Sequence, residues 1–391
     1  MLQAYDTVEE FWNAEDIEMA INSASMDSLD LFRQDFASSL NTNASHVSFT
    51  PSGRSALSSI LKAIPDSRTL VAMPAFTCPA VVDTVRDAGK KPVFLDFAPS
   101  PGQMLWKTVA DKLNAAFAAV IVTHYFGVPS DFSELVHSAT QYNVPIIEDC
   151  AHCLGGAIGH RKAGTIGDAS FFSFSTDKPL SLGYGGALIV NNRRLASCIS
   201  KNDSIRPSMK RQKRFFRMLL SDLQIRRSTL FSRRSLKTRI ADRIRSIRVK
   251  ELNVQNTFSI GNIQAELGRI SLKRYEECAQ TREANARSID DVIVNETWPI
   301  SSQVQPKRIR QKVRTRDSAD AEKLIRKLQS IGFRAGLLNW HPHSARCDLT
   351  EYPKSAEVFK HWVDIPIHQN IRPQDFDRLI TLLNVHFHEP E

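Results

Sequence analysis

Apolar and polar positions follow two alternating periods along the first 200 residues. Short runs that are apolar throughout, such as "FAAVIVT" at 117–123, have the composition of buried strands. Between them, apolar residues recur three and four positions apart, as in "PAVVDTVRDAG" at 79–89, which is the period of an amphipathic helix. The predicted strands cover 46–50, 68–75, 91–97, 115–127, 144–151, 169–175 and 185–192, and the helices 8–24, 29–40, 56–64, 79–89 and 131–143. This alternation predicts an α/β fold with a mixed, mainly parallel sheet that helices cover on both faces.

The pattern changes after residue 200. Two segments, 209–225 and 236–249, combine an apolar stripe with many basic residues and predict basic amphipathic helices. A long helix is expected at 259–286, and the remainder mixes helices such as 318–332 with short strands such as 362–367. We therefore divide the chain into N-terminal helices and a large domain (1–200), a basic helical insertion (201–250), and a linking helix with a smaller C-terminal α/β domain (251–391).

Composition places the chain among globular enzymes. It has 391 residues, of which 42% are hydrophobic and 24% charged, which is ordinary for a soluble protein of two or three domains. No apolar run approaches the roughly 20 residues that cross a bilayer. The first 20 residues are acidic and lack the basic-then-apolar order of a secretory signal. These features predict a cytoplasmic protein.

The six cysteines are scattered and do not suggest a disulfide framework. The segment "CAHC" at 150–153 has the spacing of half a zinc site. A structural zinc site normally needs a second pair of ligands, and the sequence shows no clear one. No metal is therefore expected.

Two motifs follow predicted strands and carry polar groups. In "TPSGRSALSSIL" at 50–61, Gly53, Arg54 and Ser55 lie where a strand turns into a helix, whose free N–H groups can bind a phosphate or simply form a capped turn. In "PIIEDCAHCLGG", a buried strand ends at Asp149. An acid at the carboxyl end of such a strand either faces a ligand or caps the next loop.

A single lysine, Lys178, follows the next strand in "FFSFSTDKPLSLGYGG" at 171–186. A lone lysine is most often a solvated loop residue. Here it completes a set that pyridoxal phosphate (PLP) requires: a helix N-terminus for the phosphate, a carboxylate for the ring nitrogen and an amine for the aldehyde. Apart from Asp177 no acid is near in sequence, which suits an amine that must lose its proton to react.

Several ordered segments resemble the DegT/StrS family of PLP-dependent sugar aminotransferases, which has the type I aminotransferase fold. The resemblance covers about residues 25–200 and 255–387. It rests on "FSFSTDKPLSLGYGGA", "IIEDCAHCLGG", "THYFGVPSDF", "MPAFTCPAVVDTVRDAGKKPVFLDF", "SIGNIQAELGRISLKR" and "VDIPIHQNIRPQDFDRLITLL". Several motifs in the same order make the resemblance specific.

The resemblance implies a role for each matching residue. Lys178 would form the Schiff base with PLP, Asp149 would bond the ring nitrogen, and His152 would lie against the ring face or its O3 hydroxyl. The phosphate would be bound by Ser173, Gly53, Arg54 and Ser55. Cys78 occupies the position of an aromatic residue that usually stacks on the ring.

Other departures from the family pattern concern the substrate end of the site. Tyr184 replaces a usual Glu between glycines, Pro179 replaces an Asn, and Thr257-Phe258-Ser259 replaces Asn-x-Arg. These changes leave the cofactor motifs intact and leave the identity of the substrate open.

The resemblance implies transfer of an amino group from L-glutamate or L-glutamine to a keto sugar. The sugar is expected to be nucleotide-linked, and its product to serve the biosynthesis of cell-surface polysaccharide or glycoconjugate. The protein is expected to be a homodimer. Three alternatives stay open: a PLP-fold protein that has lost catalysis and docks through its basic segment, an enzyme for a lipid-linked sugar at the membrane, and a keto-sugar dehydratase. Lys178 argues against the first and the last.

The basic segment 201–250 dominates the charge of the chain. It holds 17 of the 51 Lys and Arg residues and 3 of the 42 Asp and Glu residues, so the rest of the chain is mildly acidic despite the net charge of +9. The segment could hold a nucleotide-sugar diphosphate, lie on the anionic inner face of the membrane, or pack on this protein or its dimer partner. Nucleic acid is not an expected partner, because the sequence shows no DNA-reading motif.

Overall fold

The structure is a computed structural model, and it describes residues 5–6, 12–98, 104, 106–199, 206–228, 258–337 and 346–388. The helix expected at 236–249 and position 257 of the altered family motif lie outside the described residues.

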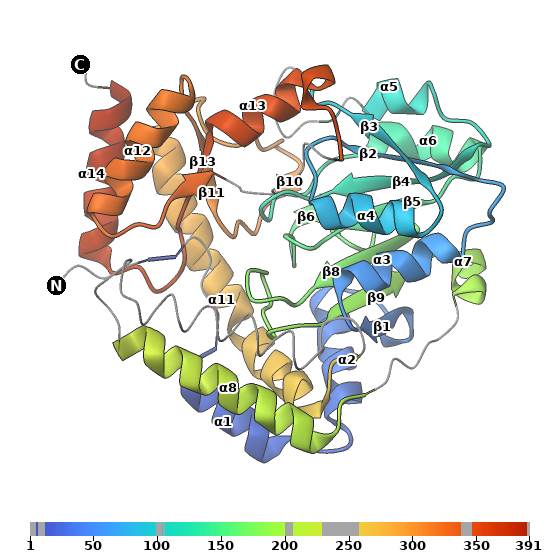
Figure 1. The fold of residues 1–391 in the computed structure, drawn as a ribbon, viewed down its shortest axis with the longest axis horizontal. Coiled ribbons are helices and arrows are strands. Elements are labelled where there is room, and N and C mark those ends of the chain that lie inside the picture. Colours follow the sequence, from blue (N-terminus) through green and yellow to red (C-terminus); the bar gives the residue numbers. More distant parts are fainter. Residues whose placement is uncertain are drawn as a thin grey trace.

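A seven-stranded sheet forms the centre of the large domain (Figure 1). In sheet order its strands are β1 (Val47–Thr50), β9 (Gly186–Val190), β8 (Ala169–Ser173), β5 (Ile146–Asp149), β4 (Phe117–Thr123), β2 (Leu70–Pro74) and β3 (Lys91–Leu95). Only β9 is antiparallel to its neighbours, so the carboxyl ends of the other six strands lie at one edge. The predicted mixed, mainly parallel sheet is confirmed.

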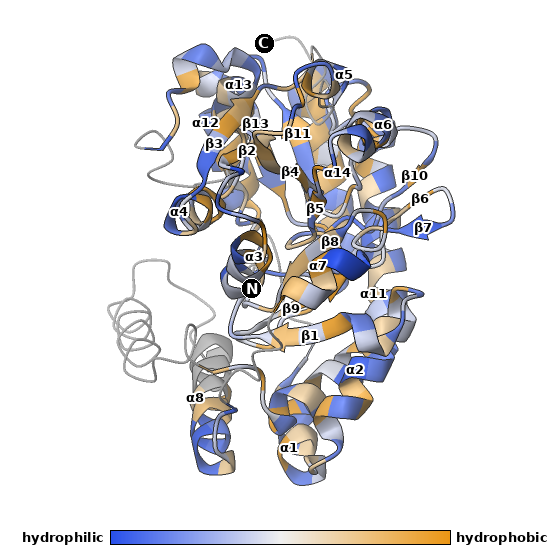
Figure 2. Ribbon diagram, turned by 90° about the vertical axis from the view of Figure 1, so that its right-hand side faces the viewer, coloured by the Kyte–Doolittle hydropathy of each residue, from blue (hydrophilic) through white to orange (hydrophobic). Residues whose placement is uncertain are grey.

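Helices cover both faces of this sheet because its strands are apolar on both sides. β4 is buried at every position, and central strands such as β4 carry mainly the hydrophobic colours in Figure 2. The helices of this part of the chain are α1 (Ala14–Ser23), α2 (Ser28–Ser39), α3 (Gly53–Lys62), α4 (Pro79–Asp87), α5 (Trp106–Ala110), α6 (Ser133–Gln141) and α7 (Arg193–Cys198), with a 3-10 turn, η1 (Ala44–His46).

Two predicted boundaries differ from the structure, each for a local reason. The helix expected at 8–24 begins at Ala14, because Asn13 and Asp16 exchange the hydrogen bonds of a capping box. The strand expected at 115–127 ends at Thr123, because the chain turns there and Phe126 adopts a left-handed conformation with φ of 56°.

The second domain is a smaller α/β layer at the C-terminal end. Its sheet has the order β11 (Gln311–Arg314), β13 (Trp362–Ile365) and β12 (Gly336–Leu337). Its helices are α12 (Ser318–Ser330), α13 (Pro353–His361) and α14 (Pro373–His388), with the 3-10 turn η3 (Leu349–Glu351). A third sheet, β10 (Val304–Gln305), β6 (Ala157–Ile158) and β7 (Arg161–Lys162), joins segments from both halves of the chain.

The long helix α11 (Asn262–Val292) connects the two domains (Figure 1). Its first half is buried with α1 and α2, where Ile263 and Leu267 belong to the core of the large domain. Its second half contributes Ala286 and Ile289 to the core of the small domain, which also contains Tyr5. The three-part division of the chain at 200 and 250 stays an interpretation.

The first basic amphipathic helix is α8 (Met209–Ser228), which lies beside α1 in Figure 1. Phe215 and Phe216 are buried in the core of the large domain. Lys210, Arg214 and Arg217 are exposed. The start of this helix therefore packs its apolar side on the protein itself and leaves its basic side outside.

Candidate active site

The predicted site residues follow the carboxyl ends of parallel strands, which meet at one edge of the sheet. Gly53 follows β1, Cys78 follows β2, and Asp149 ends β5. Ser173 ends β8, and Lys178 lies in the loop that leads to β9. Thr123 pairs with Asp149, and Asp149 with Phe171, so the ends of β4 and β5 are level and β8 extends two residues further.

Lys178 and His152 form the centre of this arrangement. The Nζ atom of Lys178 lies 3.0 Å from Nε2 of His152. Burial, together with the charges of Lys178 and Arg310, holds the pKa of His152 well below its usual range. His152 is therefore neutral near pH 7, and its Nε2 can accept a hydrogen bond from the lysine.

Lys178 also has an acidic partner, contrary to the expectation that the amine lies away from carboxylates. Its Nζ is 3.2 Å from Oδ2 of Asp177. Asp177, which precedes Lys178 in the sequence, is thus the acidic partner of this lysine. The loop allows this pairing because the backbone N–H of Lys178 turns back to the carbonyl of Ser175 at 3.1 Å.

Asp149 is a buried carboxylate at the end of β5. Burial raises its pKa to about 6, although the N–H of Ala151 and the charges of Lys178 and His124 act in the opposite direction. Its Oδ1 accepts that N–H at 3.0 Å, and the described part of the chain gives the carboxylate no other hydrogen-bond donor. A positively charged group bound beside it would lower its pKa again.

The first turn of α3 lies against the end of β8. A Cβ atom added at Gly53 would lie 3.2 Å from the carbonyl of Phe172 and 3.4 Å from Cβ of Ser173, so this contact favours glycine. The hydroxyl of Ser52 caps the helix by accepting the N–H of Ser55. Gly53, Ser55 and Ser173 are therefore brought together, whereas Arg54 is the exposed member of the predicted set.

Cys78 is the N-terminal cap residue of α4 and is partly buried. Burial raises the pKa of its thiol, and the charges of Lys178 and Asp149 also act on it. Cys78 therefore lies within electrostatic range of the lysine and the acid, at the position where the resemblance expected an aromatic ring.

Tyr184, the second departure from the family pattern, faces away from these groups into the core. It is buried, and its ring meets that of Phe215 on α8 edge to face at 5.0 Å. Gln264 of α11 donates to the carbonyl oxygens of Leu182 and Tyr184, both at 3.1 Å. The loop after Lys178 is therefore fixed by helices that are distant in sequence.

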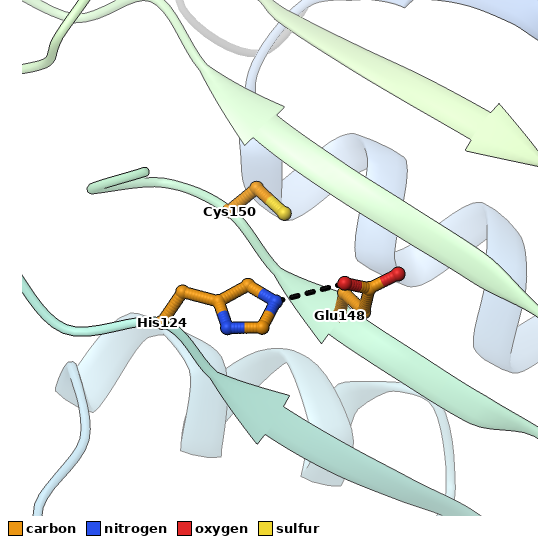
Figure 3. Close-up of side chains that lie close together, drawn as sticks. All are labelled: His124, Glu148 and Cys150. Atoms are coloured by element: carbon orange, nitrogen blue, oxygen red, sulfur yellow. Dashed lines mark hydrogen bonds and ion pairs between the residues drawn. The ribbon is translucent and has the colours of Figure 1, made fainter. Parts of the chain in front are cut away.

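A buried group of His124, Glu148 and Cys150 lies beside the site, with potential metal-ligating atoms within 4.8 Å of one another (Figure 3). Nδ1 of His124 accepts the N–H of Ser130, so Nε2 carries the proton and donates to Glu148 at 2.9 Å. Glu148 also accepts the N–H groups of residues 164, 166 and 167. These bonds outweigh burial and lower the pKa of Glu148, so the cluster needs no ion to explain it.

Sequence reasoning missed three residues that surround His152. The ring of Phe126 stacks on that of His152 with centroids 5.9 Å apart. Nζ of Lys312 and Cζ of Arg310 lie 5.0 and 5.9 Å from the centre of the Phe126 ring. The available signal was the cluster of cations Arg308, Arg310 and Lys312 in the sequence just before and within β11.

The residues present fit the needs of PLP. Asp149 is a buried acid that accepts one backbone N–H and whose raised pKa suits a cationic partner, α3 offers the free N–H groups of a helix N-terminus, and Lys178 offers an amine. Ser173 and Ser55 add hydroxyl groups beside that helix. Each of the three chemical functions that PLP requires is therefore supplied at the same edge of the sheet.

Comparisons with known proteins agree with this arrangement. Residues 15–384 match the DegT/DnrJ/EryC1/StrS aminotransferase family. The chain is 32% identical over 165 residues to GDP-perosamine synthase of Vibrio cholerae, a match that covers 42% of this chain and 44% of that protein. The chain thus spans less than half the length of the first curated relatives that it matches.

Solved structures share the fold over nearly the whole chain. An aminotransferase TlmJ from Streptoalloteichus hindustanus superposes with a TM-score of 0.76 at 20% identity, covering 98% of both chains. A putative sugar aminotransferase from Streptococcus pneumoniae, solved in its PMP form, superposes with a TM-score of 0.72 at 16% identity. The match covers 99% of this chain and 97% of that chain. The fold expected from the resemblance is confirmed.

Proposed function

Because the chain belongs to the DegT/DnrJ/EryC1/StrS aminotransferase family, we propose that it moves an amino group from an amino acid to a keto sugar with the help of PLP. The observation that carries the proposal is the placement of Lys178 beside neutral His152, at the sheet edge that also holds Asp149. L-Glutamate or L-glutamine is the proposed donor. The name of the Vibrio cholerae relative contains a GDP-linked amino sugar, which supports a nucleotide-linked acceptor.

When bound, PLP supplies an aldehyde that takes up the amino group and a ring that withdraws electrons from the reacting carbon. Lys178 would hold the cofactor through Nζ, and the same atom would carry a proton to and from the reacting carbon. Nε2 of His152 accepts a hydrogen bond from this amine and keeps it oriented. Asp177 stabilises the ammonium form whenever Nζ holds the extra proton.

Asp149 and the first turn of α3 bind opposite ends of the cofactor in this proposal. Asp149 balances a positive charge at the ring nitrogen, and this partner relieves the unfavourable burial of its own carboxylate. Gly53 allows the backbone to approach the phosphate, while Ser55, Ser173 and the exposed Arg54 supply donors. His152 and Cys78 lie beside the lysine and bound the ring.

A visible absorption spectrum of the purified protein with PLP tests the proposal. We expect a visible band that L-glutamate bleaches, because the donor displaces Lys178. Lys178→Ala should lose the band and slow the amino transfer at least about a hundredfold, while Lys112→Ala, an exposed lysine of the same domain, should behave like the wild type. A Lys178→Ala protein with normal turnover would contradict the assignment.

The partners of the protein are a separate part of the proposal. We infer a homodimer from the family resemblance, and a monomeric mass in light scattering would contradict this.

Within the described residues no helix has both the length and the apolar character needed to cross a membrane. The exposed Lys210, Arg214 and Arg217 support a peripheral, electrostatic contact with an anionic inner membrane face. Failure to float with anionic vesicles at low salt would remove that contact.

A further inference from the structure

Two buried cations lie next to the proposed active site and come from the small domain. Arg310 precedes β11, and Lys312 lies within it. Both share one carboxylate on β13: Nη1 of Arg310 is 3.2 Å from Oδ2 of Asp364, and Nζ of Lys312 is 2.9 Å from its Oδ1. The side chains of all three residues are at least nine-tenths buried.

This group carries more positive than negative charge. Two cations face a single carboxylate, and Nε of Arg310 is buried without a hydrogen-bond acceptor among the described residues. Burial lowers the pKa of Lys312, and Asp364 opposes that shift. Even a neutral Lys312 would leave the Arg310 donor unsatisfied, and an unpaired buried donor on a charged group is strongly unfavourable.

The cations share the aromatic ring that covers His152. Lys312 and Arg310 both lie within 6 Å of the centre of the Phe126 ring, which is a favourable but weak contact for a cation. The same ring also stacks on His152, the partner of Lys178. Although burial works against it, the charges of Lys178 and Arg310 lower the pKa of Asp177, so the field of Arg310 also reaches the lysine loop.

The backbone holds the cations in this place. The N–H of Lys307 donates to the carbonyl of Gly127 at 2.8 Å, and that of Ile309 donates to Phe126 at 2.9 Å. Phe126 itself has a positive φ of 56°, which is rare for a bulky residue and is found where the surrounding structure holds a functional group in position. The segment that leads to Arg310 is thus joined to the loop after β4.

We propose that Arg310 and Lys312 form a subsite that binds a carboxylate of the amino donor. The inference rests on the proposed function and adds the residues that select the donor. A carboxylate fits because it neutralises the excess charge and can accept the free N–H of Arg310 in the planar geometry that guanidinium favours. The donor is the better occupant, because its α-carboxylate is one carbon from the amine that reaches Lys178, whereas the phosphates of a nucleotide sugar are several bonds from the keto carbon.

Binding of glutarate to the PLP-loaded protein tests the subsite, because this dicarboxylate lacks the amine and cannot react. We expect calorimetry to show binding to the wild type and an affinity at least about tenfold lower in Arg310→Gln, as for loss of a charge-assisted hydrogen bond. The L-glutamate concentration that half-bleaches the visible band should rise by a similar factor. Arg310→Lys should recover part of the affinity, and Arg326→Gln, an exposed arginine of the same domain, should have no effect.

Lys312→Met is the second variant, and it decides the question if Arg310→Gln does not fold. It keeps the pairing of Arg310 with Asp364 but removes the excess charge, so glutarate should again bind more weakly. Unchanged glutarate affinity in the folded variants would overturn the subsite, as would a wild type that reacts with L-glutamate but does not bind glutarate. Absence of any visible band would instead contradict the proposed function, and glutarate binding would still report on the subsite.

Discussion

Single residues in this protein take their chemical character from burial and from one or two neighbours. Asp149 and Glu148 are adjacent on β5, and side chains of adjacent strand residues point to opposite faces. Glu148 accepts hydrogen bonds from His124 and three backbone N–H groups, so its pKa falls. Asp149 accepts one, so burial dominates and its pKa rises. Two adjacent carboxylates thus have different roles: Glu148 stabilises the fold, and Asp149 serves the proposed chemistry.

The raised pKa of Asp149 predicts how stability depends on pH. Between its unfolded value near 4 and about 6, the folded chain binds more protons than the unfolded chain, so this contribution to stability is lost as pH rises through about 6. Without PLP, Asp149→Asn should exceed the wild type in stability by about 3 kcal/mol at pH 7 and by less than about 1 kcal/mol near pH 4.

Urea denaturation of both cofactor-free proteins across this pH range measures the difference. His152 shifts stability in the opposite direction, because its pKa is lowered, but it is present in both proteins and drops out of the comparison. A difference that does not change with pH would show that the pKa of Asp149 is the same in the folded and the unfolded chain. The same substitution should impair amino transfer, since it removes the proposed partner of the ring nitrogen.

At the scale of elements, the loop after Lys178 depends on α8, α11 and the segment before α1. Nε1 of Trp12 donates to the carbonyl of Ser181 at 2.7 Å, and Gln264 binds two further carbonyls of the loop. Gln212 of α8 in turn accepts the N–H of Ile263 in the first turn of α11 at 2.9 Å. The basic helix α8 is therefore a structural support of the lysine loop as well as a charged surface.

Gln212→Ala tests this support. The substitution leaves the N–H of Ile263 buried without its acceptor and also removes the bond from Gln212 to the carbonyl of Pro207, so it should cost about 1–3 kcal/mol in the free energy of unfolding. Arg214→Ala, on the exposed side of the same helix, should change stability by less than about 0.5 kcal/mol. Equal urea midpoints for the two variants would mean that α8 does not support α11 in this way.

For the whole molecule, one close backbone contact joins the loop after β4 in the large domain to the segment before β11. A Cβ atom added at Gly127 would lie 2.1 Å from the carbonyl oxygen of Lys307, and the φ of Gly127 is +91°. This approach brings the segment before β11 against the loop after β4, and with it Arg310 near the Phe126 ring that stacks on His152.

Gly127→Ala should therefore destabilise the protein by more than about 3 kcal/mol, because it adds a backbone clash to an unfavourable φ. Gly89→Ala is the matched control: its φ of +72° is similarly left-handed, but nothing lies within 4 Å of the added atom, so about 1 kcal/mol is expected. Thermal or urea unfolding of both variants separates the two causes. A similar loss in both would show that the segments can move apart.

The sequence by itself determined the order of strands and helices, the class of the fold and the chemical set around Lys178 and Asp149. These depend on local periodicity and on residue types at strand ends, which neighbouring positions control. The tertiary structure alone decided that Asp177 pairs with Lys178, that the apolar side of α8 is buried, and that Arg310 and Lys312 share Asp364. Asp364 is more than 50 residues from both cations in the chain, and such contacts depend on the path of the backbone, which no local pattern specifies.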